Sequence, residues 1–437
     1  MHLKISCDTS STPFTTDNNI CYNSIINKNK ENTMKLKPII NSLLETDLYK
    51  FSMGCCIFHQ FNKDMTRWAF KCRNKGVKFT DEMLWEIREQ IVHFCDLRFT
   101  EEELEWLGDT LPWISSDYIL YLKRWQGDPK QISVLPSKDP CGISIEAYGS
   151  WLDTSMYEIP ILSIVNEVYF AFTYGKGALD KEFQERTIKK LGKLAEGEYE
   201  LGVFSEFGLR RRYSGKMQDW LVRKLADFRS YGFVGTSNVY LAKKYGLKPV
   251  GTMAHEFTQV VGQAHHEHNP AYSNHYMMKA WVKEYQTQNG IALTDTIGTD
   301  AFLRDFNLTY ATLFSGVRHD SGDPIVWGEK IIAHYKKLGI DPRTKTLLFS
   351  DSLDFDRATK IYRHFHDKAK VAFGIGTFLS NDCGVEPLNI VFKVIEANGS
   401  PCAKLSDVEG KGMCRDEEYV EYLKRCINWR LAHEEGN

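Results

Sequence analysis

The 437-residue sequence contains no apolar run approaching the roughly 20 residues that a membrane-spanning helix requires. It also has almost no net charge, −2 at pH 7, so no global field would recruit nucleic acid or an anionic membrane. Its eleven cysteines include no CxxC spacing, and Cys55 and Cys56 are adjacent. That pattern fits neither a zinc ribbon nor a secreted disulfide framework. These absences predict a cytoplasmic protein with reduced thiols and with no nucleic-acid or membrane partner.

Residues 1–33 differ in composition from the rest of the chain. They are rich in Ser, Thr, Asn and Lys, contain no arginine, and lack an apolar segment of signal-peptide length. Their apolar surface is too small to offset the entropy lost on ordering. We therefore expect a disordered tail that is not a transit peptide, with Met34 as a candidate functional start.

The remaining sequence changes rhythm near residue 149. Residues 34–148 mix helical and strand-like segments, including an amphipathic helix beginning at residues 47–51, and predict an α+β domain. Residues 149–385 begin with the apolar run 159–165, which leads into a helix, and then alternate between strands and helices. Such alternation predicts parallel strands in a closed or nearly closed α/β barrel. Residues 390–395 and 403–406 return to strand-like runs, joined at Asn398 and Gly399 by a strong hairpin signal.

One stretch, residues 248–257, places His255 and Glu256 after an apolar approach and a glycine. In α/β barrels, catalytic groups collect at the carboxyl ends of the strands. A hydrogen-bonded structural histidine is the plainer interpretation of this stretch alone. The catalytic interpretation gains weight because further strand-like runs also end in polar or glycine residues.

The strand ends supply a consistent set of chemical groups. Guanidiniums and glycine turns bind phosphate, and aspartates bind Mg²⁺ or ribose hydroxyls. A turn at residues 235–238 opens a helix and could present N–H groups to an anion. A single strand-end aspartate is often only a helix cap, and Arg211 or Arg212 alone would suit a solvated basic face. Together the ends predict a phosphorylated, hydroxyl-bearing substrate; their sequences are FGLRRR at 207–212, GTSN at 235–238, LTDT at 293–296, GVRHDSGDP at 316–324, FSDS at 349–352 and FGIGT at 373–377.

Two other interpretations remain open at this point. His255, His265, His266, His268 and His275 suggest a zinc hydrolase, although Glu256 is not followed by a second histidine at HExxH spacing. A non-catalytic nucleotide-binding barrel would use the same strand ends. Stoichiometric zinc would favour the first, and failure to form product from saturating substrates would favour the second.

As an ordered set, the motifs resemble those of nicotinate phosphoribosyltransferases. The matching fragments are TDLY at 46–49, YEIP at 157–160, NEVY at 166–169, FGLR at 207–210, GTSN at 235–238, GTMAHE at 251–256, LTDT at 293–296 and VRHDSGDP at 317–324. The resemblance extends from about Met34 to the C-terminus. It implies an irregular α/β barrel (149–385) packed against an α+β domain formed by residues 34–148 and 386–437.

The resemblance also implies a reaction. Nicotinate and 5-phosphoribosyl 1-diphosphate would give nicotinate mononucleotide and diphosphate, with ATP as a co-substrate, Mg²⁺ as a cofactor, and ATP hydrolysis coupled through a phosphohistidine. This would be an ATP-hydrolysing ligase acting in the first step of NAD salvage from nicotinate. The oligomeric state, monomer or homodimer, is left open, as is whether Tyr49 acts in the partner's site.

Residue roles carry over from the matching motifs. His255 matches the phosphorylated histidine, with Glu256 as its expected partner, and Asp295 and Asp320 match carboxylates near the ribose and its magnesium, Asp320 being the candidate magnesium ligand. Arg210 and Arg318 match residues that hold the substrate carboxylate or phosphates. The other expected substrate contacts are Tyr49 and Phe207 on the pyridine ring, Ser321, Gly322 and Asp323 in the 317–324 motif, and Gly374, Gly376 and Thr377 in a 5′-phosphate loop.

Ser237 bears on the choice of substrate. In the nicotinamide-using relatives the matching position resembles an aspartate, which accepts a hydrogen bond from an amide but repels a carboxylate. A neutral Ser237 near Arg210 therefore favours nicotinate. Near the C-terminus, Lys404 and Ser406 could reach phosphate, although a solvated hairpin edge is the favoured expectation. The last helix, near residues 418–433, is expected to be structural.

Overall fold

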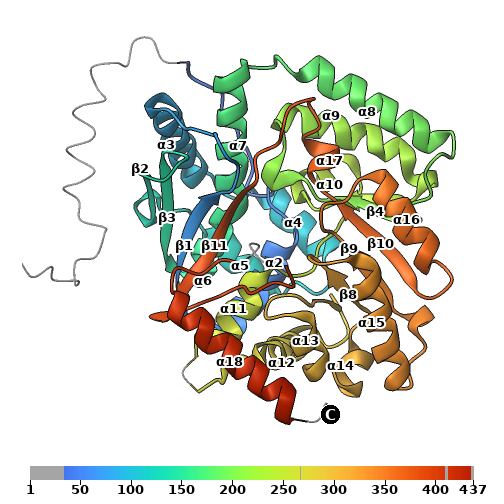
Figure 1. Ribbon diagram of the computed structural model, residues 1–437. Helices are drawn as coiled ribbons and strands as arrows, with labels where there is room; N and C mark the ends of the chain where they lie inside the picture. The colour runs from blue at the N-terminus through green and yellow to red at the C-terminus, as the bar shows by residue number, and fades with distance from the viewer. Residues whose placement is uncertain (1–33, 266, 409–411, 435–437) are drawn as a thin grey trace, which may run out of the picture. The chain divides into compact units, whose positions relative to one another are not determined.

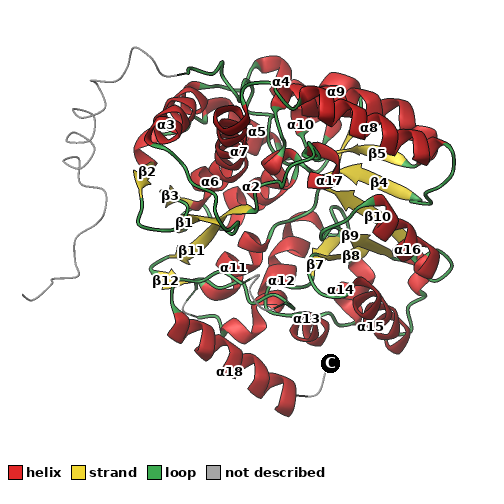
Figure 2. Cartoon of the chain, turned by 45° about the horizontal axis from the view of Figure 1, so that its top comes forward, coloured by secondary structure: helices red, strands yellow, loops and turns green. Residues whose placement is uncertain are grey.

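Two separate β-sheets organise the chain, as the computed structural model shows for residues 34–265, 267–408 and 412–434 (Figure 2). The disordered tail predicted for residues 1–33 lies outside the described residues. The described residues from Pro38 onward form one compact unit. The strands are β1 (Met65–Cys72), β2 (Ile132–Pro136), β3 (Ile143–Ser150), β4 (Val203–Glu206), β5 (Phe233–Thr236), β6 (Lys248–Pro249), β7 (Ile291–Leu293), β8 (Gly316–His319), β9 (Thr346–Phe349), β10 (Lys370–Ile375), β11 (Ile390–Ala397) and β12 (Ser400–Pro401).

Helices connect and cover these strands. The longer ones are α2 (Tyr49–Gln60), α3 (Asp81–Asp96), α4 (Glu101–Thr110), α5 (Ser116–Arg124), α7 (Glu158–Tyr174), α8 (Asp180–Ala195), α9 (Gly215–Leu225), α11 (His255–Gln263), α12 (Ser273–Tyr285), α15 (Pro324–Lys337), α16 (Phe355–Phe365) and α18 (Glu417–His433). Shorter ones are α6 (Trp151–Thr154), α10 (Val239–Tyr245), α13 (Thr299–Asp305), α14 (Leu308–Leu313) and α17 (Thr377–Ser380). Within the described ranges, every helix is too short or too polar to cross a membrane.

The larger sheet is parallel, with strand order β6-β5-β4-β10-β9-β8-β7. Its strands alternate with helices along the sequence, as predicted. The sheet is curled, and its two edge strands, β6 and β7, are not paired with each other. It therefore forms a half-barrel and not a closed barrel. The prediction of an irregular α/β barrel is therefore confirmed. Parallel strands place all their carboxyl ends at one rim, which is where polar groups can gather.

The smaller sheet is antiparallel and joins both ends of the chain. Its order is β12-β11-β1-β3-β2, and β1 pairs with β11 from Thr66↔Ala397 to Cys72↔Ile390. Figure 1 shows these two strands side by side, one coloured blue and the other red. The mixed origin of this sheet confirms the expected architecture, whereas the boundaries after residues 148 and 385 stay predictions.

Several local signals are confirmed. Thr100 caps α4 in a full capping box with Glu103. Asn398 and Gly399 have φ of 51° and 76° and join β11 to β12 through a two-residue turn. The final helix runs over Glu417–His433.

Two expectations about helices are corrected. The helix beginning near Asp47 is not amphipathic, because every residue from Tyr49 to Ile57 in α2 is buried. The apolar run at 159–165 does not precede a helix but lies inside α7, which begins at Glu158. A continuous apolar run does not distinguish a buried strand from a buried helix. Pro160 fits there because the first turn of a helix needs no backbone N–H.

Candidate functional site

A cavity of about 680 Å³ lies at the carboxyl ends of the parallel strands and against β11 of the other sheet. Residues following β4, β5, β8, β9 and β10 line it, together with the start of α2 and of α11. Its lining includes nine of the predicted residues: Tyr49, Phe207, Arg210, Ser237, His255, Arg318, Asp320, Gly376 and Thr377. The topology thus brings together side chains that lie up to 328 positions apart in the sequence, from Tyr49 to Thr377.

His255 is the first residue of α11 and projects into this cavity. Its Nε2 lies 2.9 Å from Asp295 Oδ1 and 3.5 Å from Asp320 Oδ2. Burial, aided by the charge of Lys404, lowers the pKa of His255 to about 4 despite the two carboxylates. An ionised carboxylate can only accept a hydrogen bond. In a neutral ring, Nε2 therefore carries the proton and donates a hydrogen bond to Asp295. The lone pair then lies on Nδ1, which makes Nδ1 the nucleophilic atom.

Asp295 lies behind His255 rather than on the cavity wall, with 1% of its side chain exposed. Its Oδ2 accepts a 2.6 Å hydrogen bond from Ser321 Oγ and lies 3.0 Å from Lys404 Nζ. Burial opposes ionisation, but His255 and Lys404 outweigh it and hold the pKa of Asp295 well below its usual range. This carboxylate is therefore positioned to orient the imidazole.

The expectation for Lys404 is wrong. It is 4% exposed and lines the cavity, not a solvated hairpin edge. Its alkyl chain crosses the protein interior to reach Asp295, and an isolated turn signal carries no information about such a long-range partner. Ser406 lies next to it and donates a 2.9 Å hydrogen bond to Ser321 Oγ.

Arg318 and Asp320 form a rigid pair at the end of β8. Arg318 donates from Nε to Ser350 Oγ at 2.8 Å, from Nη1 to the Met253 carbonyl at 3.2 Å, and from Nη2 to Asp320 Oδ1 at 3.1 Å. Although burial opposes ionisation, Arg318 and His255 hold the pKa of Asp320 below its ordinary value. Asp320 is therefore a charged carboxylate with its Oδ2 facing His255.

Glu256 points away from the cavity into a buried ionic cluster. Lys50 Nζ lies 2.9 Å from Glu256 Oε2 and 2.7 Å from Glu158 Oε2, and Ser155 Oγ donates to Glu256 Oε1 at 2.6 Å. Burial raises the pKa of Glu256 to about 7 although Lys50 opposes the rise. Glu256 thus ties α11 to Lys50 on α2, which in turn pairs with Glu158 at the start of α7, so the cluster stabilises the base of the site.

Another wall of the cavity combines aromatic and polar groups. Tyr49, Phe207 and Ser237 line it, and the Ser237 side chain is buried. Asp47 lies beside them, and burial raises its pKa. The backbone N–H groups of Ser237 and Asn238 already donate to Glu206 and Thr236. The turn at 235–238 therefore does not present these two N–H groups to an anion.

The three successive arginines after β4 have different environments. Arg210 and Arg211 line the cavity, and Arg211 Nε donates to the Ile390 carbonyl at 3.0 Å. Arg212 is only 1% exposed and bonds Glu45 Oε2 at 2.9 Å from Nη1. Burial lowers the pKa of Arg211 to about 9. The expectation of a solvated basic face is thus wrong for both Arg211 and Arg212.

Most of the remaining predicted residues lie behind the side chains that line the cavity. Asp323 accepts from the N–H groups of Ile325 and Val326 and so caps α15, while Gly322 has φ of 89° in the preceding turn. Gly374 packs directly against the ring of Phe207: a Cβ added to Gly374 would lie 2.3 Å from a ring carbon of Phe207. Gly376 and Thr377 do reach the cavity, at the start of α17. Glu256, Asp295, Ser321, Gly322, Asp323 and Gly374 are absent from the cavity lining.

Sequence reasoning missed several charged lining residues. Half-buried Lys393 lies on β11, and burial and the Lys404 charge lower its pKa to about 7. Val391 and Lys393 both line the cavity because alternate residues of a strand face the same side. A lysine interrupting the apolar run 390–395 was the available signal. Other lining residues outside the motifs singled out above are Arg73, Arg186, Asp354, Asn381, Asp382 and Asn389, whereas Asp351 belongs to the strand end FSDS and Asp47 to the fragment TDLY.

One set of cavity residues fits a divalent cation. The ligand atoms of His255, Asp295 and Asp320 lie within 4.8 Å of one another. Mg²⁺ is held by oxygen ligands, commonly one or two carboxylates together with substrate phosphates. Asp320 suits that role because it lines the cavity, whereas Asp295 is occupied by Ser321 and Lys404.

Of the histidines in the zinc-hydrolase interpretation, His265 and His268 lie close together, with ring centroids 5.3 Å apart, but each has another partner. His265 pairs with Asp64 at 3.1 Å, and His268 stacks on Tyr276 at 3.7 Å between ring centroids. Neither His265, His268 nor His275 belongs to a metal-capable group among the described residues, and His266 lies outside them.

Comparison with known proteins gives a consistent result. Residues 203–430 match the model of the nicotinate phosphoribosyltransferase family, and residues 44–166 match its N-terminal domain. A nicotinate phosphoribosyltransferase of Cupriavidus necator is 45% identical over 398 residues, covering 90% of this chain and 100% of the relative. One from Burkholderia mallei is 44% identical, covering 89% and 96%.

Solved structures agree. The nicotinate phosphoribosyltransferase of Porphyromonas gingivalis superposes with a TM-score of 0.82 at 35% identity, covering 89% of this chain and 100% of that one. The structure from Vibrio cholerae gives a TM-score of 0.83 at 34% identity, covering 89% and 94%.

Proposed function

Because the chain belongs to the nicotinate phosphoribosyltransferase family, we propose that its cavity joins nicotinate to 5-phosphoribosyl 1-diphosphate and couples the reaction to ATP. The observation that carries the proposal is His255 held by Asp295 at a cavity lined by aromatic, cationic and carboxylate side chains. The products are nicotinate mononucleotide and diphosphate. The reaction would serve as the first step of NAD salvage from nicotinate, in the cytoplasm.

The chemical demand of this reaction is mainly electrostatic. As the C1–O bond breaks, positive charge develops on the ribose and negative charge on the departing diphosphate. Arg210, Arg318 and Lys404 place cationic groups at the cavity before the reaction begins. Asp320 supplies a carboxylate, and Mg²⁺ bound through it and the substrate would neutralise diphosphate charge. The pyridine nitrogen is itself the nucleophile, so no general base is needed.

The aromatic wall fits the other substrate. A pyridine ring can stack on Tyr49 and Phe207, both of which line the cavity of their own chain. The Ser237 hydroxyl and the Arg210 guanidinium offer hydrogen bonds and charge to a carboxylate substituent. This pairing supports an anionic pyridine acid as substrate.

The coupling to ATP is assigned to His255. Its Nδ1 lone pair would attack the γ-phosphorus, forming a P–N bond while the bond to ADP breaks and ADP leaves. Water later hydrolyses the P–N bond and releases phosphate. Asp295 would stabilise the developing imidazolium by accepting from Nε2. The added negative charge, about 1.5 to 2 units by analogy with other phosphorylated side chains, would alter diphosphate binding at the cavity.

One experiment tests both the activity and its coupling. Wild type and His255→Asn are assayed for nicotinate mononucleotide formation with and without ATP, and are incubated with γ-labelled ATP. Wild type should form product and acquire acid-labile label, whereas the variant should lose the label and most of the ATP stimulation.

The outcomes separate the two parts of the proposal. Absence of product from wild type would contradict the activity, and full labelling of the variant would contradict the assignment of His255. Phosphorus NMR of the labelled wild type provides a stricter check, because the proposal places phosphate on Nδ1 and not on Nε2.

A further inference from the structure

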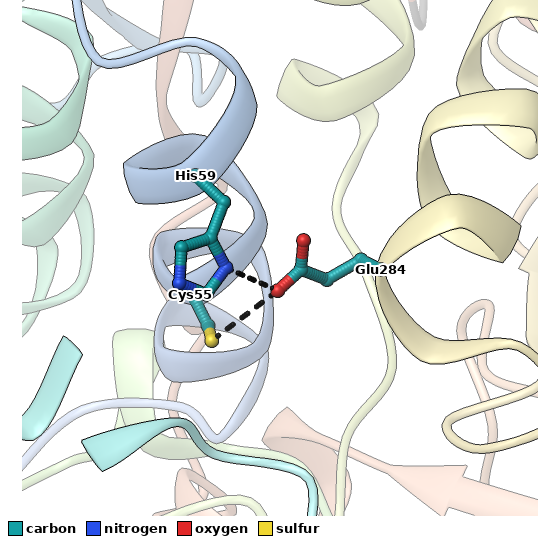
Figure 3. Close-up of side chains that lie close together, drawn as sticks. All are labelled: Cys55, His59 and Glu284. Atoms are coloured by element: carbon teal, nitrogen blue, oxygen red, sulfur yellow. Dashed lines mark hydrogen bonds and ion pairs between the residues drawn. The ribbon is translucent and has the colours of Figure 1, made fainter. Parts of the chain in front are cut away.

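A second group of potential ligands lies outside the cavity, between α2 and α12. Cys55 and His59 occupy adjacent turns of α2, and Glu284 faces them from α12 (Figure 3). Glu284 Oε1 lies 2.5 Å from His59 Nδ1 and 3.6 Å from Cys55 Sγ. Ligand atoms of the three residues all lie within 4.8 Å of one another, and none of them lines the cavity.

The spacing and the donor types suit a transition metal. Residues four apart on a helix present their side chains on one face, which aims a thiol and an imidazole at the same point. Zn²⁺ accepts Cys, His and carboxylate ligands at about 2.0–2.3 Å. Neighbouring ligand atoms of a tetrahedral zinc are therefore about 3–4 Å apart, which is close to the Cys55–Glu284 separation. The short His59–Glu284 contact is a hydrogen bond that would open on metal entry.

Surrounding residues orient these ligands. Asp117 Oδ2 lies 3.2 Å from His59 Nε2, on the side of the ring opposite Glu284. A carboxylate on the second ring nitrogen is the usual partner of a metal-bound histidine, because it fixes the ring and the tautomer. Gln60 Nε2 donates to Glu284 Oε2 at 3.2 Å, which leaves Oε1 directed at Cys55 and His59.

The site would be partly open to solvent. The side chain of His59 is 28% exposed and that of Asp117 is 61% exposed, whereas Glu284 is 10% exposed. Cys55 is buried, so the thiol forms the floor and the imidazole forms the rim. Three protein ligands with an open side leave room for water as a fourth ligand.

We propose that Cys55, His59 and Glu284 form a zinc-binding site that fastens α2 to α12. The plainer alternative is a protonated His59 between Glu284 and Asp117, with the Cys55 thiol donating a weak hydrogen bond. That alternative makes the sulfur dispensable, whereas the metal site requires it as a thiolate. Dependence on Cys55 therefore distinguishes the two.

The consequence would be mechanical and not catalytic. The first turn of α2 carries Tyr49 at the cavity and Lys50 in the ionic cluster. Tyr285 donates a hydrogen bond from its hydroxyl to the Ser52 carbonyl and already links α12 to the middle of α2. Metal bound near the other end of α2 would hold this helix at a second point.

Cobalt(II) is the sharpest probe, because sulfur ligation gives a charge-transfer band that nitrogen and oxygen ligands do not. The reduced, chelator-treated full chain is titrated with Co²⁺ and then with Zn²⁺. The variants are Cys55→Ser and Glu284→Gln, and the controls are Cys426→Ser, a thiol on α18, and His255→Asn in the cavity. Glu284→Gln keeps the side-chain shape and serves if Cys55→Ser fails to fold.

Wild type, Cys426→Ser and His255→Asn should bind one cobalt per chain with the sulfur band, and zinc should displace it. Cys55→Ser should lose the band, and Glu284→Gln should bind at least about tenfold more weakly. Zinc should also raise the unfolding midpoint of wild type but not of Cys55→Ser. No sulfur band in wild type, or an unchanged band in Cys55→Ser, would overturn the proposal. Because the readout is metal binding, it is independent of whether the chain forms nicotinate mononucleotide.

Discussion

The side chains around His255 illustrate how far single residues could be interpreted from the sequence. The glycine and apolar approach at 248–254 indicated His255, because strand ends deliver reactive groups to a barrel rim. Its partner Asp295 lies 40 positions further along the chain, and Lys404, which pairs with Asp295, lies 149 positions further. Their pairing depends on the curl of one sheet and on the return of the chain through the other. Local patterns contain neither, so the role of Lys404 was missed.

Ser237 carries the first prediction at this scale. Its hydroxyl lies at the aromatic wall of the cavity, with Asp47 beside it. Ser237→Asp should lower kcat/KM for nicotinate by at least about tenfold, because a second carboxylate there repels an anionic substrate in a desolvated site. Steady-state kinetics with nicotinate and with nicotinamide measure the effect.

Ser237→Asn is the matched control, since it has nearly the same shape as the aspartate variant but no charge. It should retain clearly more nicotinate activity than Ser237→Asp. Equal losses in both variants would attribute the effect to bulk and would contradict the electrostatic argument.

At the scale of elements, the strand ends were predictable and the long helices were less so. Most of the parallel strands coincide with short apolar runs that end in polar or glycine residues, and that pattern is typical of the strands of an α/β chain. α2 and α7 are buried nearly all round, so their periodicity does not distinguish them from strands. Burial on every side of a helix arises only when the elements are assembled, so the local sequence of such a helix contains little periodic pattern from which to predict it.

The contact between β10 and the segment after β4 supports a prediction about Phe207. Gly374 on β10 leaves the space that the Phe207 ring fills, and a Cβ there would lie 2.3 Å from ring carbon Cδ2. Gly374→Ala should therefore displace the ring and raise KM for nicotinate by about tenfold or more, because small misplacements of a positioning group are costly. KM for 5-phosphoribosyl 1-diphosphate should change much less.

Gly192→Ala on α8 is the control for this substitution. A Cβ there meets nothing within 4 Å, and the change should leave both KM values unaltered while slightly stabilising the helix. A Gly374→Ala enzyme with unchanged nicotinate KM would show that Phe207 does not position the pyridine ring.

For the whole molecule, the ionic cluster of Lys50, Glu158 and Glu256 is where α2, α7 and α11 meet. These three helices come from both predicted domains, and their charged groups contact one another in a buried environment. From the sequence, Glu256 was expected to partner His255, and no local pattern indicated that it would contact Lys50 instead. Only the assembled fold makes them partners, and burial of the cluster gives it a measurable pH signature.

Glu256→Gln tests that signature. Burial raises the pKa of Glu256 to about 7, so between its ordinary value near 4.5 and pH 7 the folded chain holds a proton that the unfolded chain has lost. The stability that this group contributes is therefore fully present at low pH and declines as pH rises through 7. The free energy of unfolding of wild type minus that of Glu256→Gln should fall by up to about 3 kcal/mol between about pH 5 and pH 8.

Urea unfolding of wild type and of Glu256→Gln, repeated across this pH range, measures the difference in unfolding free energy. Groups that titrate in the same way in both proteins contribute equally to both and cancel from the difference. Glu105→Gln, the same substitution at an exposed position on α4, is the control. A flat or rising difference for Glu256→Gln would mean that Lys50 keeps the Glu256 carboxylate ionised throughout. In that case Glu158 and Glu256 would both be ionised at neutral pH, against the single positive charge of Lys50. The first turn of α11, which carries His255, would then begin at a cluster with a permanent net negative charge.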